Sequence, residues 1–226
     1  MVLDVCLPLP AERSDLARAV RRTAAWAERA KAAHRRRDDQ ALFGIGQGGT
    51  DAALRRESAQ RTVALDFDGY SIGGLSVGEE RGPMMGALEA AIAELPADQP
   101  RYLMGVGDPR SMIEAVARGV DMFDCVLPTR LGRHGTLLTD RGRVNAKRAE
   151  FSRSDRPIDP ACACSVCATY SAGYLRHLLV VGEPAGKTLC ALHNLAWMLA
   201  FVDRMRAAIA AGTLDALRSE VAAVWA

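Results

Sequence analysis

The chain contains 226 residues, of which 49% are hydrophobic and 25% charged, and its formal net charge is +2. This length and composition fit a globular protein with one ordinary domain, or with one domain and an appendage. The small net charge does not by itself indicate a nucleic-acid-binding protein, because such domains usually show a strongly basic face. Residues 1–10 lack the basic start of a signal peptide, and no stretch approaches the roughly 20 apolar residues of a membrane span. We therefore expect a cytoplasmic protein without a membrane partner.

Two segments of the chain are rich in basic residues. The first contains Arg18, Arg21, Arg22, Arg29, Lys31, Arg35, Arg36 and Arg37, for which a solvated helix face is the better explanation. The second contains Arg130, Arg133, His134, Arg141, Arg143, Lys147 and Arg148. For this second segment, a solvated helix face or loop and a contact with nucleic-acid phosphates are equally good interpretations.

Apolar runs and helical patterns alternate along the first part of the chain. Residues 1–6 fit the tail of a strand, and a long helix is expected over residues 14–36. Further apolar runs predict buried parallel strands at residues 41–47, 70–75, 102–107 and 122–127. Apolar residues at three-to-four spacing predict helices between these strands, at residues 50–64, 79–95 and 109–118.

Glycine-rich or polar turns follow the predicted strands, as in a barrel whose active site forms at the C-terminal ends of its strands. Closing such a barrel takes about eight strands, and the sequence predicts only four complete strand–helix units. The predicted fold class is therefore α/β, namely the C-terminal part of a TIM (β/α)8 barrel that is incomplete at its N-terminus. We assign this half-barrel to residues 1–152.

The composition changes after Phe151, where prolines and a cluster of cysteines begin. We predict that residues 153–226 form a small zinc-binding subdomain and C-terminal helices. The expected helices of this part lie near residues 170–181, 188–211 and 213–225.

A metal site is indicated by the cysteine spacing. Cys162, Cys164 and Cys167 form a CxCxxC motif, and His193 follows at the expected start of an apolar helix. Three thiolates and one imidazole are the ligands of a closed, structural zinc site, so we predict Zn²⁺ with a role in folding. Cys190 stands three residues before His193 and could face the same side of a helix. The sequence therefore leaves Cys190 open as an alternative fourth ligand.

Asp124 lies in the segment MFDCVLPTR at the end of the last predicted strand, where barrel enzymes hold catalytic side chains. An isolated aspartate in a loop serves equally well as a helix N-cap or an ion-pair partner.

The sequence blocks around Asp124 favour a catalytic role for it. The chain contains a series of blocks, namely MVLDVC, FGIGQGG, DGYSIGGLSVGE, RYLMGVG, MFDCVLPTR and CACSVCATYSAGYLRHL, followed by LHNLAW. In order and spacing, these blocks resemble the bacterial tRNA-guanine transglycosylases over essentially the whole chain.

This resemblance implies a pentosyltransferase of queuosine biosynthesis. In that family the aspartate that matches Asp124 attacks the anomeric carbon of the wobble nucleotide in tRNA, expels guanine and forms a covalent intermediate. The target base must first leave its stack. The entering base is the deazaguanine precursor of queuine, preQ1, because Cys6 and Val77 match the bacterial pocket.

The resemblance also implies the residues that bind the base. Asp4 would accept hydrogen bonds from its Watson–Crick edge, while Gln47 and the main-chain amide of Gly74 would read its carbonyl. The carbonyl of Leu75 would accept from the aminomethyl group of preQ1. Met104 would pack against one face of the base.

Other roles are open for several of these residues. Met104 fits a core position and Gln47 a strand-end cap. Glu79, which by resemblance steadies the turn around the base, also fits the start of a helix, where carboxylates are favoured. Arg130 and Arg133 resemble family positions near the RNA backbone, where a guanidinium grips phosphate at two points.

Two functions therefore remain open. The family chain is longer at its N-terminus, where it carries a second aspartate as general base and a tyrosine that stacks on the base. The chain is then a shortened transglycosylase, acting as a homo-oligomer or with the missing N-terminal half. Tyr170, Tyr174 and His177 match the aromatic patch of the family homodimer, although local core packing explains them equally. The alternative is a non-catalytic zinc-containing protein that binds RNA or another subunit.

Overall fold

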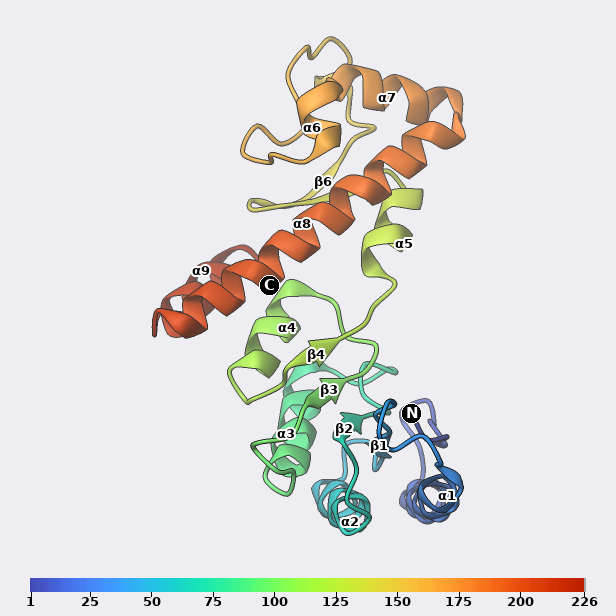
Figure 1. The fold of residues 1–226 in the computed structure, drawn as a ribbon. Helices are drawn as coiled ribbons and strands as arrows, with labels where there is room; N and C mark the ends of the chain where they lie inside the picture. Colours follow the sequence, from blue (N-terminus) through green and yellow to red (C-terminus); the bar gives the residue numbers. More distant parts are fainter. Residues whose placement is uncertain (226) are drawn as a thin grey trace. The chain divides into compact units, whose positions relative to one another are not determined.

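The computed structural model describes residues 1–225, which divide into two compact units. The first unit is Met1–Cys125, and the second begins at Val126 (Figure 1). The division lies earlier than the expected boundary at residue 152. The reason is that residues 127–145 form a helix and a hairpin that pack against the long helix of the second unit.

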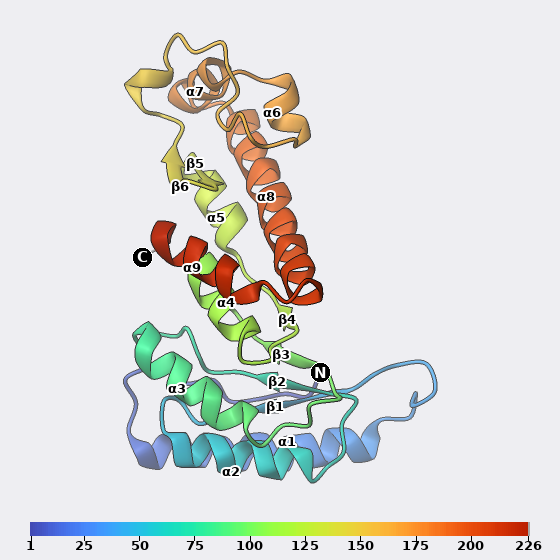
Figure 2. The same ribbon diagram turned by 90° about the vertical axis from the view of Figure 1, so that its left-hand side faces the viewer.

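A four-stranded parallel sheet forms the centre of the first unit, with strand order β1-β2-β3-β4. The strands are β1 (Phe43–Gly46), β2 (Gly69–Ile72), β3 (Arg101–Leu103) and β4 (Met122–Phe123). The helices are α1 (Arg13–Ala33), α2 (Ala52–Val63), α3 (Arg81–Ile92) and α4 (Pro109–Val116). Figure 2 shows α1 and α2 side by side along one face of this sheet. The expected mixed α/β fold with a parallel sheet is thus confirmed.

Apolar side chains of the central strands form the core of this unit. Ile45, Ile72 and Leu103, which come from three successive strands, are at most 2% exposed. Their burial removes branched apolar surface from water and stabilises the sheet. Because the strands are parallel, the turns that follow them all lie at the same edge of the sheet. Those turns lie at the carboxyl ends of the strands, where the predicted site residues occur.

All the predicted strands are shorter than expected, and the first and the last differ most. Residues 1–6 contain no assigned strand, although the amide of Val2 donates to the carbonyl of Phe43 at 3.0 Å, so the segment runs beside β1. The last predicted strand, residues 122–127, has only two strand residues. It stops early because Leu127 and Pro128 already open the next helix, where proline fits the first turn.

Aspartates start two of the helices that follow the strands. Asp51 caps α2 by accepting from the amides of Ala53 and Leu54, both at 3.0 Å. Asp108 caps α4 through the amide of Ser111 at 2.9 Å, with Pro109 in the first turn. These caps set where each strand-to-helix turn ends.

The second unit is built around a long helix, α8 (Pro184–Ala210) (Figure 1). Its other elements are α5 (Leu127–Arg133), the antiparallel hairpin β5 (Thr136–Thr139) and β6 (Gly142–Asn145), the 3-10 turn η1 (Ala149–Phe151), α6 (Ser165–Thr169), α7 (Ala172–Val181) and α9 (Leu214–Val224). The expected helices near residues 170–181, 188–211 and 213–225 are confirmed. The hairpin and α5 were not predicted, since the basic residues of this segment fit either a solvated helix face or a loop.

Helix α5 packs closely on α8 because it carries Gly132 at the contact. A Cβ atom at this position would lie 2.6 Å from the backbone nitrogen of Ala191, so a side chain there would force the helices apart. Helix α7 ends at Gly182, whose positive φ of 83° suits the left-handed end of a helix. Proline at position 184 then starts α8.

Among residues 1–225, no helix combines the length and the apolar character needed to cross a membrane.

Candidate functional site

Three of the predicted base-binding residues come together at the carboxyl ends of β1 and β2. Gln47 directly follows β1, is 3% exposed, and donates from its side-chain amide to the carboxylate of Asp4. Its backbone amide donates to Ser58 Oγ at 2.8 Å, which fixes the residue against α2. Gly74, with φ of 66°, turns the chain beside the Gln47 side chain, where an added Cβ would collide with Gln47 Oε1. Asp4, Gln47 and Gly74 are therefore neighbours, as the resemblance implies.

A buried arginine links the two turns that carry these residues. Arg55, on α2, is 1% exposed and donates to the carbonyls of Gly49 at 2.7 Å, Gly73 at 2.6 Å and Gly74 at 2.8 Å. Burial lowers the pKa of Arg55 to about 10, while the nearby Glu79 and Cys6 act in the opposite direction. The guanidinium is still charged near neutral pH.

The turn after Leu75 is held by a carboxylate. Glu79 accepts from the amide of Ser76 and from the amide of Val77, the latter at 3.0 Å. Ser76 has φ of 59°, an unfavourable value for a residue with a side chain, and this pair of bonds stabilises it. Glu79 therefore steadies this turn and does not begin α3, whose N-cap is Glu80.

Asp124 lies just beyond β4 and is exposed, but one of its oxygens is held in place. The hydroxyl of Tyr102 donates to Asp124 Oδ1 at 2.6 Å, and the amide of Gly105 donates to the same oxygen at 2.7 Å. Burial and the neighbouring Asp124 carboxylate raise the pKa of Tyr102 to about 12, so the phenol stays protonated and remains a donor. Oδ2 of Asp124 takes part in neither of these two bonds.

Met104 and Leu75 differ in exposure. Met104, directly after β3, is half-buried, and its amide donates to the carbonyl of Ile72 at 3.1 Å. Its side chain is therefore not fully enclosed in the core, the alternative that the sequence left open. Leu75 is 2% exposed, so its side chain belongs to the core.

The two predicted phosphate-binding arginines belong to the second unit. Arg130 and Arg133 lie on α5, are both exposed and stand three residues apart, which places them on neighbouring parts of one helix face. They place two positive charges in the last turn of this short helix, where they also complement the negative end of the helix dipole.

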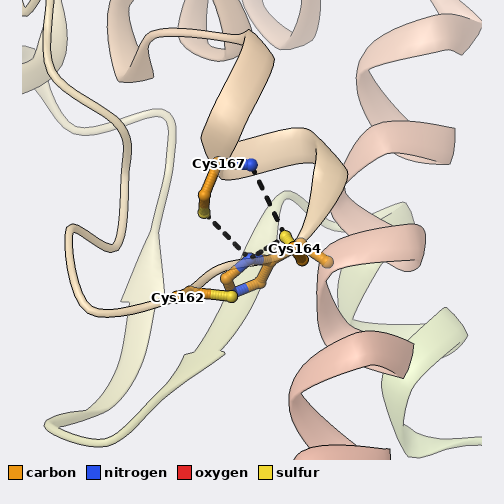
Figure 3. A group of neighbouring side chains, drawn as sticks. Cys162, Cys164 and Cys167 are labelled. Atoms are coloured by element: carbon orange, nitrogen blue, oxygen red, sulfur yellow. Dashed lines mark hydrogen bonds between the residues drawn. The ribbon is translucent and has the colours of Figure 1, made fainter.

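The second unit contains a cluster suited to a metal ion. The sulfur atoms of Cys162, Cys164 and Cys167 and a ring nitrogen of His193 all lie within 4.8 Å of one another. Figure 3 shows the three cysteines converging, with Cys164 at the N-cap of the short helix α6 and Cys167 within that helix. Nδ1 of His193 is 3.5 Å from the sulfur of Cys164 and 3.3 Å from that of Cys167.

The other ring nitrogen of His193 fixes its orientation. Nε2 lies 2.9 Å from the carbonyl of Leu138 and donates to it, which leaves Nδ1 as the nitrogen available to a metal ion. Burial lowers the pKa of His193, which favours the neutral ring that ligates metals. His193 lies in the middle of α8 and not at the start of a helix, where the sequence pattern had indicated it.

Deprotonation of these cysteines is unfavourable without a nearby cation. Burial raises the pKa of Cys167 to about 12, and it also raises the pKa of Cys162. A divalent cation would reverse this balance, because coordination deprotonates a thiol outright. Cys190 is 0% exposed in the core around Leu175 and does not belong to the metal cluster found among residues 1–225. The four-residue set is thus the one that fits a tetrahedral ion.

Tyr170 and Tyr174 stack with ring centroids 5.4 Å apart and an interplanar angle of 17°. Tyr174 is 45% exposed, so this pair does not belong wholly to the core. Their proposed place in a homodimer contact stays a prediction.

Sequence reasoning missed three residues that organise these sites. Tyr102 could have been found from the sequence, because it lies in the predicted strand next to the one that leads to Asp124. Arg55 carried none, because an arginine on a helix is usually solvated. Asn194 is 0% exposed and holds the hairpin and α5 by accepting from Leu138 and donating to the carbonyls of Pro128 and Thr136.

Comparisons of the sequence with known proteins point to one family. The family model described as queuine tRNA-ribosyltransferase matches residues 1–226. A relative from Symbiobacterium thermophilum, named queuine tRNA-ribosyltransferase, is 51% identical over 225 residues, which cover 100% of this chain and 56% of the relative. Relatives of the same name from Bacillus subtilis and Moorella thermoacetica are each 50% identical over 220 residues, covering 97% of this chain and 58% and 59% of the relatives. The chain therefore spans less than two thirds of the length of these relatives.

Proposed function

Because this chain belongs to the queuine tRNA-ribosyltransferase family, we propose that it carries the nucleophile and part of the base pocket of a tRNA-guanine transglycosylase. The reaction exchanges the wobble guanine of tRNA for preQ1, and it belongs to queuosine biosynthesis. The parallel strand–helix units of the first unit then form part of a TIM barrel, with the reactive residues at the carboxyl ends of the strands.

The held carboxylate of Asp124 is the observation that carries this proposal. Tyr102 and Gly105 both bond to Oδ1, so Oδ2 is the oxygen proposed to attack the anomeric carbon. As the C1′–Oδ2 bond forms, the bond from C1′ to guanine breaks and its electron pair leaves with the base. The departing guanine takes up a proton. A ring nitrogen of the entering base then attacks C1′ and loses its proton, while the C1′–Oδ2 bond breaks and its electron pair returns to Asp124. Two displacements let the leaving and entering bases use one pocket.

Base recognition is proposed for the cluster at the ends of β1 and β2. The carboxylate of Asp4 accepts from ring and exocyclic N–H groups, while the amides of Gln47 and Gly74 donate to the base carbonyl. Adenine would leave these groups unpaired, which gives a physical reason for a guanine-like substrate. Leu75 offers its carbonyl to the aminomethyl group of preQ1, and Met104 packs on the base.

Zn²⁺ is the metal that we propose for the cluster of Cys162, Cys164, Cys167 and His193. Three sulfur atoms and one nitrogen match the preference of zinc for a closed structural site, and the site offers no open ligand position for catalysis. The ion would stabilise the second unit by holding α6 and α8 together.

We further propose that Arg130 and Arg133 contact the tRNA backbone and that the stacked tyrosines belong to a homodimer contact. A tRNA substrate implies a cytoplasmic enzyme. Alanine at both arginines should weaken tRNA binding and reduce its salt dependence, by roughly one unit of slope for each phosphate that is no longer bound. Unchanged salt dependence would remove these residues from the RNA interface.

The proposed function is tested by incorporation of labelled guanine into unmodified tRNA of the queuosine-receiving set. The purified chain is compared with Asp124→Asn and with Asp121→Asn, a matched control at an exposed aspartate three residues earlier. We expect exchange that Asp124→Asn abolishes and Asp121→Asn retains. Exchange that survives Asp124→Asn refutes the nucleophile, and tRNA binding without any exchange assigns this chain a non-catalytic RNA-binding role instead.

A further inference from the structure

A single buried side chain joins the two turns of the proposed base pocket. Arg55 reaches from α2 to the carbonyl of Gly49, in the turn after β1, and to the carbonyls of Gly73 and Gly74, in the turn after β2. The distances, 2.6–2.8 Å, are those of strong charge-assisted hydrogen bonds. The guanidinium is 1% exposed, so water does not compete for these carbonyls.

These bonds fix the direction in which the next amide points. A trans peptide group is planar, and its C=O and N–H bonds point in opposite directions. The carbonyl of Gly73 points at Arg55, so the amide of Gly74, which belongs to the same peptide group, points away from Arg55. In the same way, the carbonyl bond of Gly74 turns the amide of Leu75 away from the arginine.

The other side of this turn faces the proposed pocket. A Cβ atom added to Gly73 would lie 2.7 Å from Gln47 Nε2 and 3.2 Å from Asp4 Oδ2. Gln47 and Asp4 therefore lie close to the glycine pair and are themselves bonded to each other. Glycine at both positions leaves room for these side chains and permits the positive φ of Gly74.

We propose that Arg55 is the positioning residue for base recognition, which aims the Gly74 amide at the carbonyl of the bound base by holding the opposite side of that peptide. This inference rests on the proposed function and deepens it, because it names the residue that sets specificity for a 6-carbonyl purine. The positive charge also polarises the Gly73–Gly74 peptide, which strengthens its N–H as a donor.

Lysine cannot replace this arginine without loss. The planar guanidinium presents its N–H groups as a fixed fork and reaches three carbonyls at once, whereas an ammonium is a compact point charge on a flexible stem. Arg55→Lys therefore keeps the charge and loses the geometry. Arg61, on the same helix, is a matched control, because it is half exposed and pairs only with the surface residue Glu57 at 3.0 Å.

The experiment measures equilibrium binding of guanine and of 6-thioguanine to the whole chain by calorimetry. The two bases differ at one atom, since 6-thioguanine keeps the ring and exocyclic N–H groups and replaces the carbonyl oxygen with a poorer acceptor. In the unsubstituted protein and in Arg61→Lys, guanine should bind roughly tenfold more tightly than 6-thioguanine. In Arg55→Lys this preference should fall to about twofold or less, because the Gly74 amide is no longer aimed at the oxygen.

The possible outcomes distinguish failure of the proposed base pocket from failure of the role of Arg55. No binding of either base to the unsubstituted protein refutes the proposed base pocket itself. Base binding with an unchanged preference in Arg55→Lys overturns the role of Arg55 and leaves the pocket standing. A purely structural role would lower the unfolding midpoint and both affinities equally, without changing their ratio.

A measurement on the unsubstituted protein covers the case in which Arg55→Lys does not fold. Guanine should slow hydrogen exchange at the Gly74 amide and at the Arg55 Nη1–H that donates to the Gly73 carbonyl together, as followed by NMR, because a base held by this turn tightens the bonds on both sides of that peptide. Slower exchange at Gly74 without any change at Arg55 would overturn the proposal. The side chain of Arg61 should show no change.

Discussion

The hydroxyl of Tyr102 offers a sharp test of how Asp124 is held. Tyr102→Phe removes one of the two donors to Asp124 Oδ1, the phenol at 2.6 Å, and leaves the Gly105 amide at 2.7 Å. The ring itself, which packs beside β4, is kept. The substitution therefore changes one hydrogen bond and very little volume.

The size of the effect follows from the kind of bond that is removed. Hydrogen bonds to charged groups contribute roughly 1.5–3 kcal/mol. Because Asp124 is exposed and keeps a second donor, we expect the lower end, about 1.5 kcal/mol. If that energy serves to orient Oδ2 for attack, the exchange rate should fall about tenfold.

Single-turnover incorporation of labelled guanine, at saturating tRNA, measures this rate directly. Tyr70→Phe is the matched control, since Tyr70 lies on the neighbouring strand β2 and makes no bond to Asp124. We expect a slower rate and an unchanged tRNA affinity for Tyr102→Phe, and a normal rate for Tyr70→Phe. A Tyr102→Phe rate within about twofold of the unsubstituted protein, or an equal loss in both variants, would refute the orienting role.

Three further outcomes are expected. Cys164→Ser should abolish binding of one Zn²⁺ and unfold the second unit, as followed by circular dichroism, whereas Cys190→Ala should keep the metal. Loss of zinc in Cys190→Ala would contradict the ligand set. Asn194→Ala leaves three backbone groups unpaired and should lower the free energy of unfolding by about 3 kcal/mol or more, as measured by urea titration. A decrease of less than about 1 kcal/mol would contradict this role. The pKa of Tyr102 is raised from 10.0 to about 12, so the stability that its protonated hydroxyl contributes is complete below pH 10 and is lost as the pH rises towards 12. Tyr102→Phe should remove this decrease in the free energy of unfolding with pH.

The sequence identified two groups of residues that the structure brings together, one at strand ends and one around the cysteine motif. Cysteines at CxCxxC spacing have few other uses in a compact fold, and their convergence with His193 is confirmed. Asp4, Gln47 and Gly74, which are far apart in the chain, were brought together by the resemblance, and their proximity is observed. Their role in binding a base stays a prediction.

Several features could not be read from local patterns. No strand was predicted for the hairpin β5–β6, and its Leu138 amide donates to Asn194, which lies 56 residues later in the chain. The position of His193 within α8 was misjudged because helix starts are weakly encoded, and Pro184 began the helix earlier than expected. Cys190 remained ambiguous because spacing on a helix does not say which face is buried.

The sequence by itself determined the family, the alternation of strands and helices, and the three cysteines and one histidine that converge in one cluster, because these depend on composition and spacing along the chain. Only the tertiary structure decided which groups hold the functional side chains. Tyr102 and Arg55 act through hydrogen bonds to atoms that lie 22 and up to 19 positions away. Such bonds depend on the relative direction of two strand ends, and this direction is set by sheet packing and not by local sequence.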